Sequence, residues 1–241
     1  MSRNVFNIKA NHKIVGILGG MGPYATSFFF NNVLNTNNAK KDWDHTRLVI
    51  DNNTKIPSRT RALLYGEESP YKEIYNTCKK LERYPVDIII IPCNSVHYWI
   101  KDLKQKIKIP IVSIVDVTVE ALFNLDSFKK VSVLGGYVTH KKALYKESIE
   151  NNGAEYVAIC KDQQVDIGNM IERIKLLDED INDLRKDFIS LVDEIIERNQ
   201  CNVIILGCTE FSLFKDEEFK IPIIDSSTEL ALFANKFGKS K

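Results

Sequence analysis

Short apolar runs alternate with longer segments of helical periodicity from residue 13 to the end of the chain. The runs are rich in β-branched residues, which is typical of buried strands in a parallel sheet. In segment 71–83, by contrast, Ile74, Cys78 and Leu81 recur at spacings of four and three, which indicates a helix. We predict strands at 14–18, 46–51, 87–91, 109–114, 131–134, 154–160, 202–206 and 221–224, and helices at 25–34, 71–83, 95–106, 115–125, 139–151, 163–177, 180–199 and 227–237. Phenylalanines are expected on the core face of the first helix, and a polar loop is expected at 52–59. This alternation predicts α/β folding with right-handed crossovers.

The second half of the chain repeats landmarks of the first half. Leu-Gly-Gly occurs at residues 18 and 134, cysteine at 93 and 208, and Ile-Pro-Ile at 109 and 221, with offsets of 116, 115 and 112. Three landmarks in one order at nearly constant spacing indicate an internal duplication. We predict a tail at 1–12, a first lobe of 13–115 plus 225–241, and a second lobe of 116–224.

Composition narrows the class of protein without identifying it. The 33 Lys and Arg residues nearly balance 32 Asp and Glu residues, so nothing favours nucleic acid or an anionic membrane as a partner. No apolar run approaches the roughly 20 residues that span a bilayer, and the polar start of the chain lacks a signal sequence, so we expect a cytoplasmic protein. The five cysteines are odd in number and form no CxxC pair, so we expect neither disulfides nor a structural zinc site.

Two cysteines stand at the candidate site. Cys93 ends an apolar run of four isoleucines, and Cys208 ends the equivalent run in the second half. A helix is predicted just after each thiol, and the positive end of a helix dipole lowers the pKa of a thiol. If the lobes face each other across a cleft, one thiolate removes a proton from a substrate carbon while the other thiol delivers one to the opposite face. The alternative is that both are small core residues, as we expect of Cys78, Cys160 and Cys201.

Polar residues beside the thiols are candidates for binding a carboxylate. Asn94, Ser95 and Thr209 follow the cysteines, where they could hold an anion or simply cap the next helix. Arg59 and Lys175 lie 116 residues apart, so each lobe could place one cation in the cleft for a substrate with two carboxylates. Either could equally be a solvated surface cation.

Two further features fit a supporting role. His97 follows Cys93 by about one helical turn, and we expect it to be packed rather than catalytic. The loop Gly19-Gly20-Met21-Gly22 matches neither a dinucleotide fingerprint nor a P-loop, since no Gly-Lys-Ser/Thr follows. Its backbone N–H groups could instead approach a small anionic ligand.

At these residues the chain resembles the aspartate/glutamate racemase superfamily, and within it the aspartate racemase branch. The matching pieces are Gly-Gly-Met-Gly-Pro at 19–23, Ile-Pro-Ser-Arg-Thr at 56–60, Ile-Pro-Cys-Asn-Ser at 91–95 and Leu-Gly-Cys-Thr-Glu at 206–210. The resemblance runs from about Lys13 to the C-terminus. Two positions depart from the pattern: Ser58 stands where the family often has Asp, and Gly136 where it often has Thr.

The resemblance implies a fold, a reaction and a set of site residues. The fold would be two pseudo-symmetric Rossmann- or flavodoxin-like lobes, with the last helix returning to the first lobe and the active site between the lobes. The enzyme would be a homodimer that racemises aspartate or glutamate without a cofactor or metal, with Cys93 and Cys208 as the acid/base pair. The expected substrate-binding residues are Met21, Arg59, Asn94, Ser95, Thr139, Lys175 and Thr209.

Two alternatives stay open. The same fold could racemise another amino acid or hydantoin, or isomerise or decarboxylate a dicarboxylate. A protein of another class could close its two lobes on a small anion without turning it over.

Overall fold

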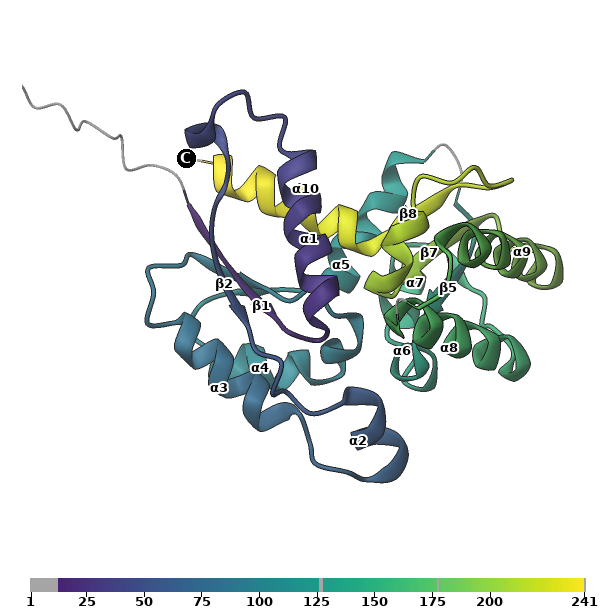
Figure 1. The fold of residues 1–241 in the computed structure, drawn as a ribbon, viewed down its shortest axis with the longest axis horizontal. Coiled ribbons are helices and arrows are strands. Elements are labelled where there is room, and N and C mark those ends of the chain that lie inside the picture. The colour runs from purple at the N-terminus through teal and green to yellow at the C-terminus, as the bar shows by residue number, and fades with distance from the viewer. Residues whose placement is uncertain (1–12, 126–127, 177, 241) are drawn as a thin grey trace, which may run out of the picture.

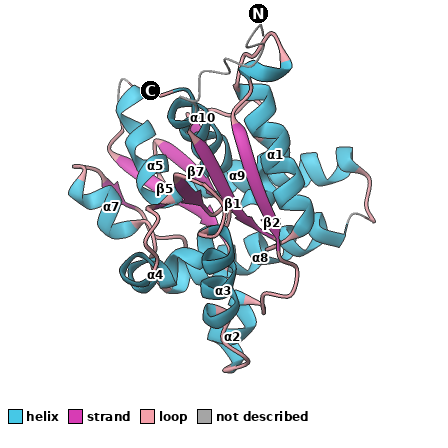
Figure 2. Ribbon diagram, turned by 90° about the vertical axis from the view of Figure 1, so that its left-hand side faces the viewer, coloured by secondary structure: helices cyan, strands magenta, loops and turns pink. Residues whose placement is uncertain are grey.

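The protein, described by a computed structural model for residues 13–240 except 126–127 and 177, contains two four-stranded parallel sheets (Figure 1). The tail predicted at 1–12 lies outside the described residues. Strands lie in the interior and helices form the outer layers (Figure 2). The predicted α/β architecture of two sheets flanked by helices is therefore confirmed.

The first sheet has the strand order β2-β1-β3-β4. Its strands are β1 (Ile14–Gly19), β2 (Arg47–Asn52), β3 (Ile88–Ile90) and β4 (Ile111–Val112). The accompanying helices are α1 (Pro23–Thr36), α2 (Arg59–Tyr65), α3 (Tyr71–Leu81), α4 (Ile100–Lys106) and α5 (Ile114–Glu120), with 3₁₀ helices η1 (Asp42–Asp44), η2 (Asn94–Trp99) and η3 (Ala121–Asn124).

The second sheet has the order β6-β5-β7-β8, which repeats that of the first. Its strands are β5 (Lys130–Gly135), β6 (Glu155–Tyr156), β7 (Val203–Gly207) and β8 (Ile223–Asp225). The helices in this half of the chain are α6 (Tyr137–Lys141), α7 (Lys146–Asn151), α8 (Lys161–Leu176) and α9 (Ile181–Asn199), with the 3₁₀ helix η4 (Thr209–Phe214), and the last helix is α10 (Ser226–Lys239). Because β3 and β7 occupy equivalent places, the two cysteine-bearing strand ends are equivalent too.

Both halves also close the turn after their first strand in the same way. A Cβ atom added to Gly19 would lie 2.4 Å from Thr26 Cγ2, and one added to Gly135 would lie 2.6 Å from Thr139 Cγ2. Each glycine therefore lets a threonine of the following helix pack directly on the strand end. Thr139 holds in the second half the place of Thr26 in the first.

One hydrophobic cluster joins the two halves. It includes Val15 and Phe29 from the first half, Val131 and Val203 from the second, and Ala231 on the last helix. Helix α10 packs against α1 and α5, as Figure 1 shows for the yellow and purple helices. The side-chain amide of Asn235 donates to the carbonyl of Val33 at 2.8 Å across this contact. The exact lobe boundaries stay a prediction.

Three local predictions were wrong. Of the three phenylalanines on α1 only Phe29 is buried, while Phe28 and Phe30 are 42% and 38% exposed, because three consecutive residues cannot share one helix face. The predicted helix 139–151 is split into α6 and α7, with Ala143 between them at a positive φ of 45°. Helix α2 was missed, and its Ser58 N-cap accepts from the N–H of Arg61.

Candidate active site

Cys93 lies just beyond β3 and caps the 3₁₀ helix η2. Its backbone is extended, and its side chain is only 7% exposed. His97, one turn later, does not contact the thiol: its Nδ1–H donates to the Cys93 carbonyl at 3.0 Å, and its Nε2 accepts from the N–H of Ile114 at 2.9 Å. Burial lowers the pKa of His97 to about 4, so the ring is neutral. His97 therefore fixes the backbone under Cys93, which agrees with the packed role expected for it.

Cys208 has charged neighbours on its own segment and on α8. Its S–H donates to Glu210 Oε2 at 2.9 Å, and Thr209 Oγ1 donates to the same oxygen at 3.4 Å. Burial raises the pKa of Cys208 well above its ordinary value, the Glu210 carboxylate raises it further, and Lys175 opposes them. Part of the Cys208 surface nevertheless stays accessible.

The expected lowering of the thiol pKa by a helix dipole is thus wrong for Cys208. Each thiol is followed by a six-residue 3₁₀ helix instead of a long α-helix, so few peptide dipoles are aligned behind it. At Cys208 desolvation and a neighbouring carboxylate outweigh that small dipole.

Tyr145, between α6 and α7, ties the two cysteine-bearing segments together. Its hydroxyl donates to Asn94 Oδ1, next to Cys93. Its ring lies against Gly207, next to Cys208, where a Cβ atom would be 3.5 Å from Tyr145 Cε2. Tyr145 is 1% exposed, and burial raises the pKa of its hydroxyl. The sequence analysis missed this residue, although Phe29 lies 116 positions earlier and the added hydroxyl was a visible signal.

Asn94 is held on both sides of its amide. Besides accepting from Tyr145, it donates through Nδ2 to Ser226 Oγ at 3.2 Å, and Ser226 Oγ donates to the carbonyl of Leu206 at 2.7 Å. This buried chain runs from the segment after β3 to the end of β7. Asn94 therefore links the two halves, and its predicted contact with substrate would use the remaining amide hydrogen.

Arg59 lies at the first residue of α2 and reaches the glycine loop. Its Nη2 donates to the carbonyl of Met21 at 2.9 Å and its Nη1 to that of Pro57 at 3.3 Å. Its buried Nε has no hydrogen-bond partner among the described residues. Helix α2 contacts η2, which begins after Cys93, and α6 of the second half, so Arg59 lies on an element between the two halves. Arg59 and Met21 are thus brought together, and their contact with substrate stays a prediction.

Lys175 lies in the last turn of α8, beside the second thiol. It pairs with Glu172 at 3.0 Å. Partial burial acts to lower the pKa of Lys175, but Glu210, Glu172 and Cys208 outweigh burial and raise it. The predicted second-lobe cation is therefore in electrostatic contact with Cys208.

Three other predicted ligand residues differ in their exposure and in their hydrogen bonds. Thr139 is 1% exposed, and its Oγ1 has no hydrogen-bond partner among the described residues. Thr209 is buried beside Glu210, and Ser95 is half-buried on η2. Their contact with substrate stays a prediction.

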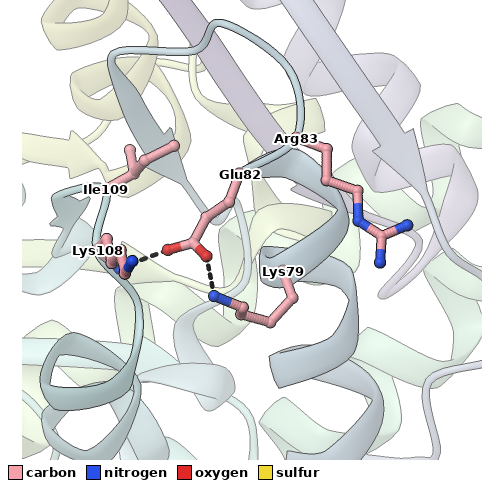
Figure 3. Close-up of a pocket in the computed structure, with 5 residues that line it drawn as sticks. All are labelled: Lys79, Glu82, Arg83, Lys108 and Ile109. Atoms are coloured by element: carbon pink, nitrogen blue, oxygen red, sulfur yellow. Dashed lines mark hydrogen bonds and ion pairs between the residues drawn. The ribbon is translucent and has the colours of Figure 1, made fainter.

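Two surface cavities lie away from the cysteines. One of about 460 Å³ is lined by Lys79, Glu82, Arg83, Lys108 and Ile109, and Figure 3 shows Glu82 turned toward Lys79 and Lys108. Another, of about 540 Å³, lies between β2 and the end of α3. The residues around the first cavity precede β3 and β4, whereas ligands of α/β sheets bind beyond the carboxyl ends of strands. We therefore assign the site to the cysteine ends and not to the first cavity.

The described part of the chain has no group of three or more His, Cys, Asp or Glu side chains placed to bind a metal ion. None of its helices is long and apolar enough to cross a membrane.

Racemases are among the known proteins that this chain resembles, and the similarity covers most of the chain. A sequence model of the Asp/Glu/hydantoin racemase family matches residues 18–234. The broad-specificity amino-acid racemase RacX of Bacillus subtilis strain 168 is 31% identical over 223 residues, covering 90% of this chain and 95% of that protein. The structure of the Picrophilus torridus aspartate racemase matches with a TM-score of 0.83 and 30% identity over 95% of both chains. An aspartate racemase homologue from Pyrococcus horikoshii matches with a TM-score of 0.77 at 22% identity, covering 95% of this chain and 100% of that one, which shows the shared fold.

Proposed function

Because the chain belongs to the Asp/Glu/hydantoin racemase family, we propose that it racemises an acidic amino acid, aspartate or glutamate, by proton exchange between two cysteines. The observation that carries this proposal is the equivalent placement of Cys93 and Cys208 at the ends of β3 and β7, with Tyr145 contacting the residue next to each. Two thiols on opposite sides of one carbon serve both faces, which a single base does not.

In this mechanism the residues of the chain supply every proton. One cysteine thiolate takes the Cα proton, the electron pair stays on the substrate as a carbanion or enolate, and the other S–H protonates the opposite face. No cofactor is required by this sequence of steps. Cations and N–H groups around the substrate carboxylates stabilise the charge that develops in the transition state.

Exchange of the Cα hydrogen with solvent tests the two-thiol mechanism. The L and D forms of aspartate and glutamate are incubated in D₂O with the wild type, Cys93→Ala and Cys208→Ala, and deuterium at Cα and enantiomeric composition are followed. Each single variant should lose racemisation by at least about 100-fold, at the lower end of what a positioned acid or base contributes. Cys201→Ala is the matched control, because Cys201 precedes the same strand β7 at its other end. Undiminished racemisation in either test variant would contradict the mechanism, and absence of exchange in the wild type would favour a binding protein.

Substrate class rests on the two cations. Arg59 at the glycine loop of the first half and Lys175, whose charge acts on Cys208 in the second, suit a dicarboxylic amino acid. The similarity to a broad-specificity amino-acid racemase favours a second candidate, in which several side chains are accepted. Arg59→Met distinguishes them: it should raise KM for aspartate and glutamate while leaving KM for alanine within about twofold. An equal effect on all substrates would favour the broad specificity.

We also propose that the enzyme is a homodimer. The family resemblance implies this state, and Tyr24 and Phe28 expose aromatic rings one turn apart on α1. Such neighbouring apolar side chains are common in interfaces.

A further inference from the structure

The two thiols differ in their surroundings although their strands are equivalent. Cys208 donates its S–H to a carboxylate at 2.9 Å, whereas no hydrogen bond from the described residues reaches the sulfur of Cys93. At the equivalent position, two residues after the thiol, the first half has Ser95 and the second has Glu210. At this pair of equivalent positions, only the thiol of the second half therefore has a carboxylate.

We propose that Glu210 is a positioning residue that holds the proton on Cys208 in the substrate-free enzyme, and that Cys93 accepts the substrate proton from this state. This inference rests on the proposed two-thiol mechanism. A carboxylate that accepts an S–H bond has nothing to accept once the sulfur is a thiolate, and two negative charges then lie in contact. By accepting this hydrogen bond, Glu210 also fixes the orientation of the Cys208 side chain.

Protons and electrons balance in the resulting cycle. The Cα–H bond breaks, its proton bonds to the Cys93 thiolate, and the electron pair remains on the substrate. The Cys208 S–H bond then breaks and its proton bonds to Cα from the opposite face, leaving a Cys208 thiolate. Water returns the enzyme to its starting state by protonating Cys208 and receiving a proton from Cys93.

The charged and titratable groups that face Cys208 come from three elements. Glu210 lies on η4, Lys175 on α8, and the Tyr145 hydroxyl lies in the segment between α6 and α7. Lys175 is paired with Glu172 and acts on both Glu210 and Cys208, so it offsets the carboxylate partly. Burial is the largest cause of the raised pKa of Cys208, and the raising effect of the Glu210 carboxylate comes next, ahead of the opposing effect of Lys175.

Alkylation of the free enzyme by iodoacetamide measures this directly and requires no turnover. The rate at each cysteine is followed by peptide mass spectrometry from pH 6 to about 11.5, because the wild-type midpoint of Cys208 is expected well above the ordinary thiol value. Glu210→Gln keeps the size and the acceptor oxygen but removes the charge, so the pH midpoint for Cys208 should fall by at least about one unit. The thiolate fraction at fixed lower pH then rises about tenfold, and the rate about threefold because nucleophilicity falls with pKa. Rescue is expected with Glu210→Asp, whose midpoint should lie between those of Glu210→Gln and the wild type.

Two further variants separate this role from general loosening. Glu172→Gln removes the same charge from the same cluster without contacting Cys208, and its midpoint should move by less than half as much. Lys175→Met removes the opposing cation and should raise the Cys208 midpoint, which provides a test of opposite sign should Glu210→Gln fail to fold. An unchanged or raised midpoint in Glu210→Gln, a shift as large in Glu172→Gln, or a lowered one in Lys175→Met would overturn the inference. If the wild type shows no Cα exchange while the Cys208 midpoints shift as expected, the proposed racemase function is rejected and the effect of Glu210 on Cys208 stands.

Discussion

Replacing Tyr145 with phenylalanine removes one atom from the link between the two halves. The hydroxyl donates to Asn94 Oδ1 in a buried environment, and burial raises the pKa of this hydroxyl, so it stays a donor at all ordinary pH values. The phenyl ring keeps its packing against Gly207. The perturbation is therefore confined to a hydrogen bond, without the cavity that truncation to alanine would leave.

The expected loss follows from the acceptor that remains. A buried acceptor left without its donor costs about 1–3 kcal/mol. For a chain of this length each kcal/mol corresponds to about 2–4 °C in melting temperature, so a fall of about 4–8 °C is expected for a loss of about 2 kcal/mol. Asn94 would then be held only through Ser226, and a displacement of about 1 Å next to Cys93 would reduce kcat about 100-fold.

Urea unfolding and Cα exchange measure the two effects separately. Trp99, in the 3₁₀ helix that begins after Cys93, provides a local fluorescence signal. Tyr156→Phe is the matched control, because that hydroxyl has no hydrogen-bond partner among the described residues, and it should change the unfolding free energy by less than about 0.5 kcal/mol. A Tyr145→Phe protein as stable as the wild type would refute the buried bond, and one that is less stable but equally active would refute its role in positioning Cys93.

The remaining predictions concern buried histidines and tight glycines. Burial lowers the pKa of both His97 and His140 to about 4, below the value of about 6.5 in the unfolded chain, so the unfolded state binds more protons between these values. The free energy of unfolding should therefore fall as pH falls from about 6.5 to 4, by about 2 kcal/mol per histidine at pH 5. Urea titrations should show a weaker pH dependence in the double variant His97→Gln/His140→Gln than in the wild type. Gly135→Ala should cost about 1–3 kcal/mol because its Cβ would meet Thr139 at 2.6 Å, whereas Gly168→Ala, on α8 with open space around it, should gain about 0.5–1 kcal/mol. Equal melting temperatures for these two alanine variants would show that the contact with Thr139 does not limit the site.

The pattern of apolar and polar residues predicted where the strands lie and that the two sheets are alike. Apolar β-branched runs located all eight strands, and the repeated Leu-Gly-Gly and Ile-Pro-Ile landmarks predicted that the two sheets would be built alike. Strand ends were less well predicted: residues 154–160 form only the two-residue β6, because sheet pairing and not hydrophobicity decides where a ladder ends. Helix α2 was missed because its seven residues bury none of their side chains.

The site was predictable where chemistry follows sequence position and not where it depends on contacts between distant segments. Cys93, Cys208 and Lys175 could be proposed because the duplication places the two cysteines, and Lys175 with Arg59, in register. Tyr145 was not, since its importance arises from contacting Asn94, 51 positions away in the sequence, and Gly207. The pKa direction of Cys208 was wrong for the same reason: dipole arguments use only the following helix, whereas desolvation depends on everything packed around the thiol.

Duplication initially suggests that the two thiols are interchangeable, but their partners argue otherwise. Two positions after each thiol the chain has Ser95 in one half and Glu210 in the other, and four positions after it has His97 and Ser212. His97 holds the backbone of Cys93 through its carbonyl, whereas Ser212 donates to Asp225, which caps α10, at 2.8 Å. The backbone scaffold is thus repeated while the polar groups that hold each thiol have diverged. A racemase needs equal access to both faces of its substrate but, at the start of a turnover, one base and one acid. In the proposed mechanism, divergence of the side chains on a symmetric backbone would supply that difference without moving either sulfur from its strand end.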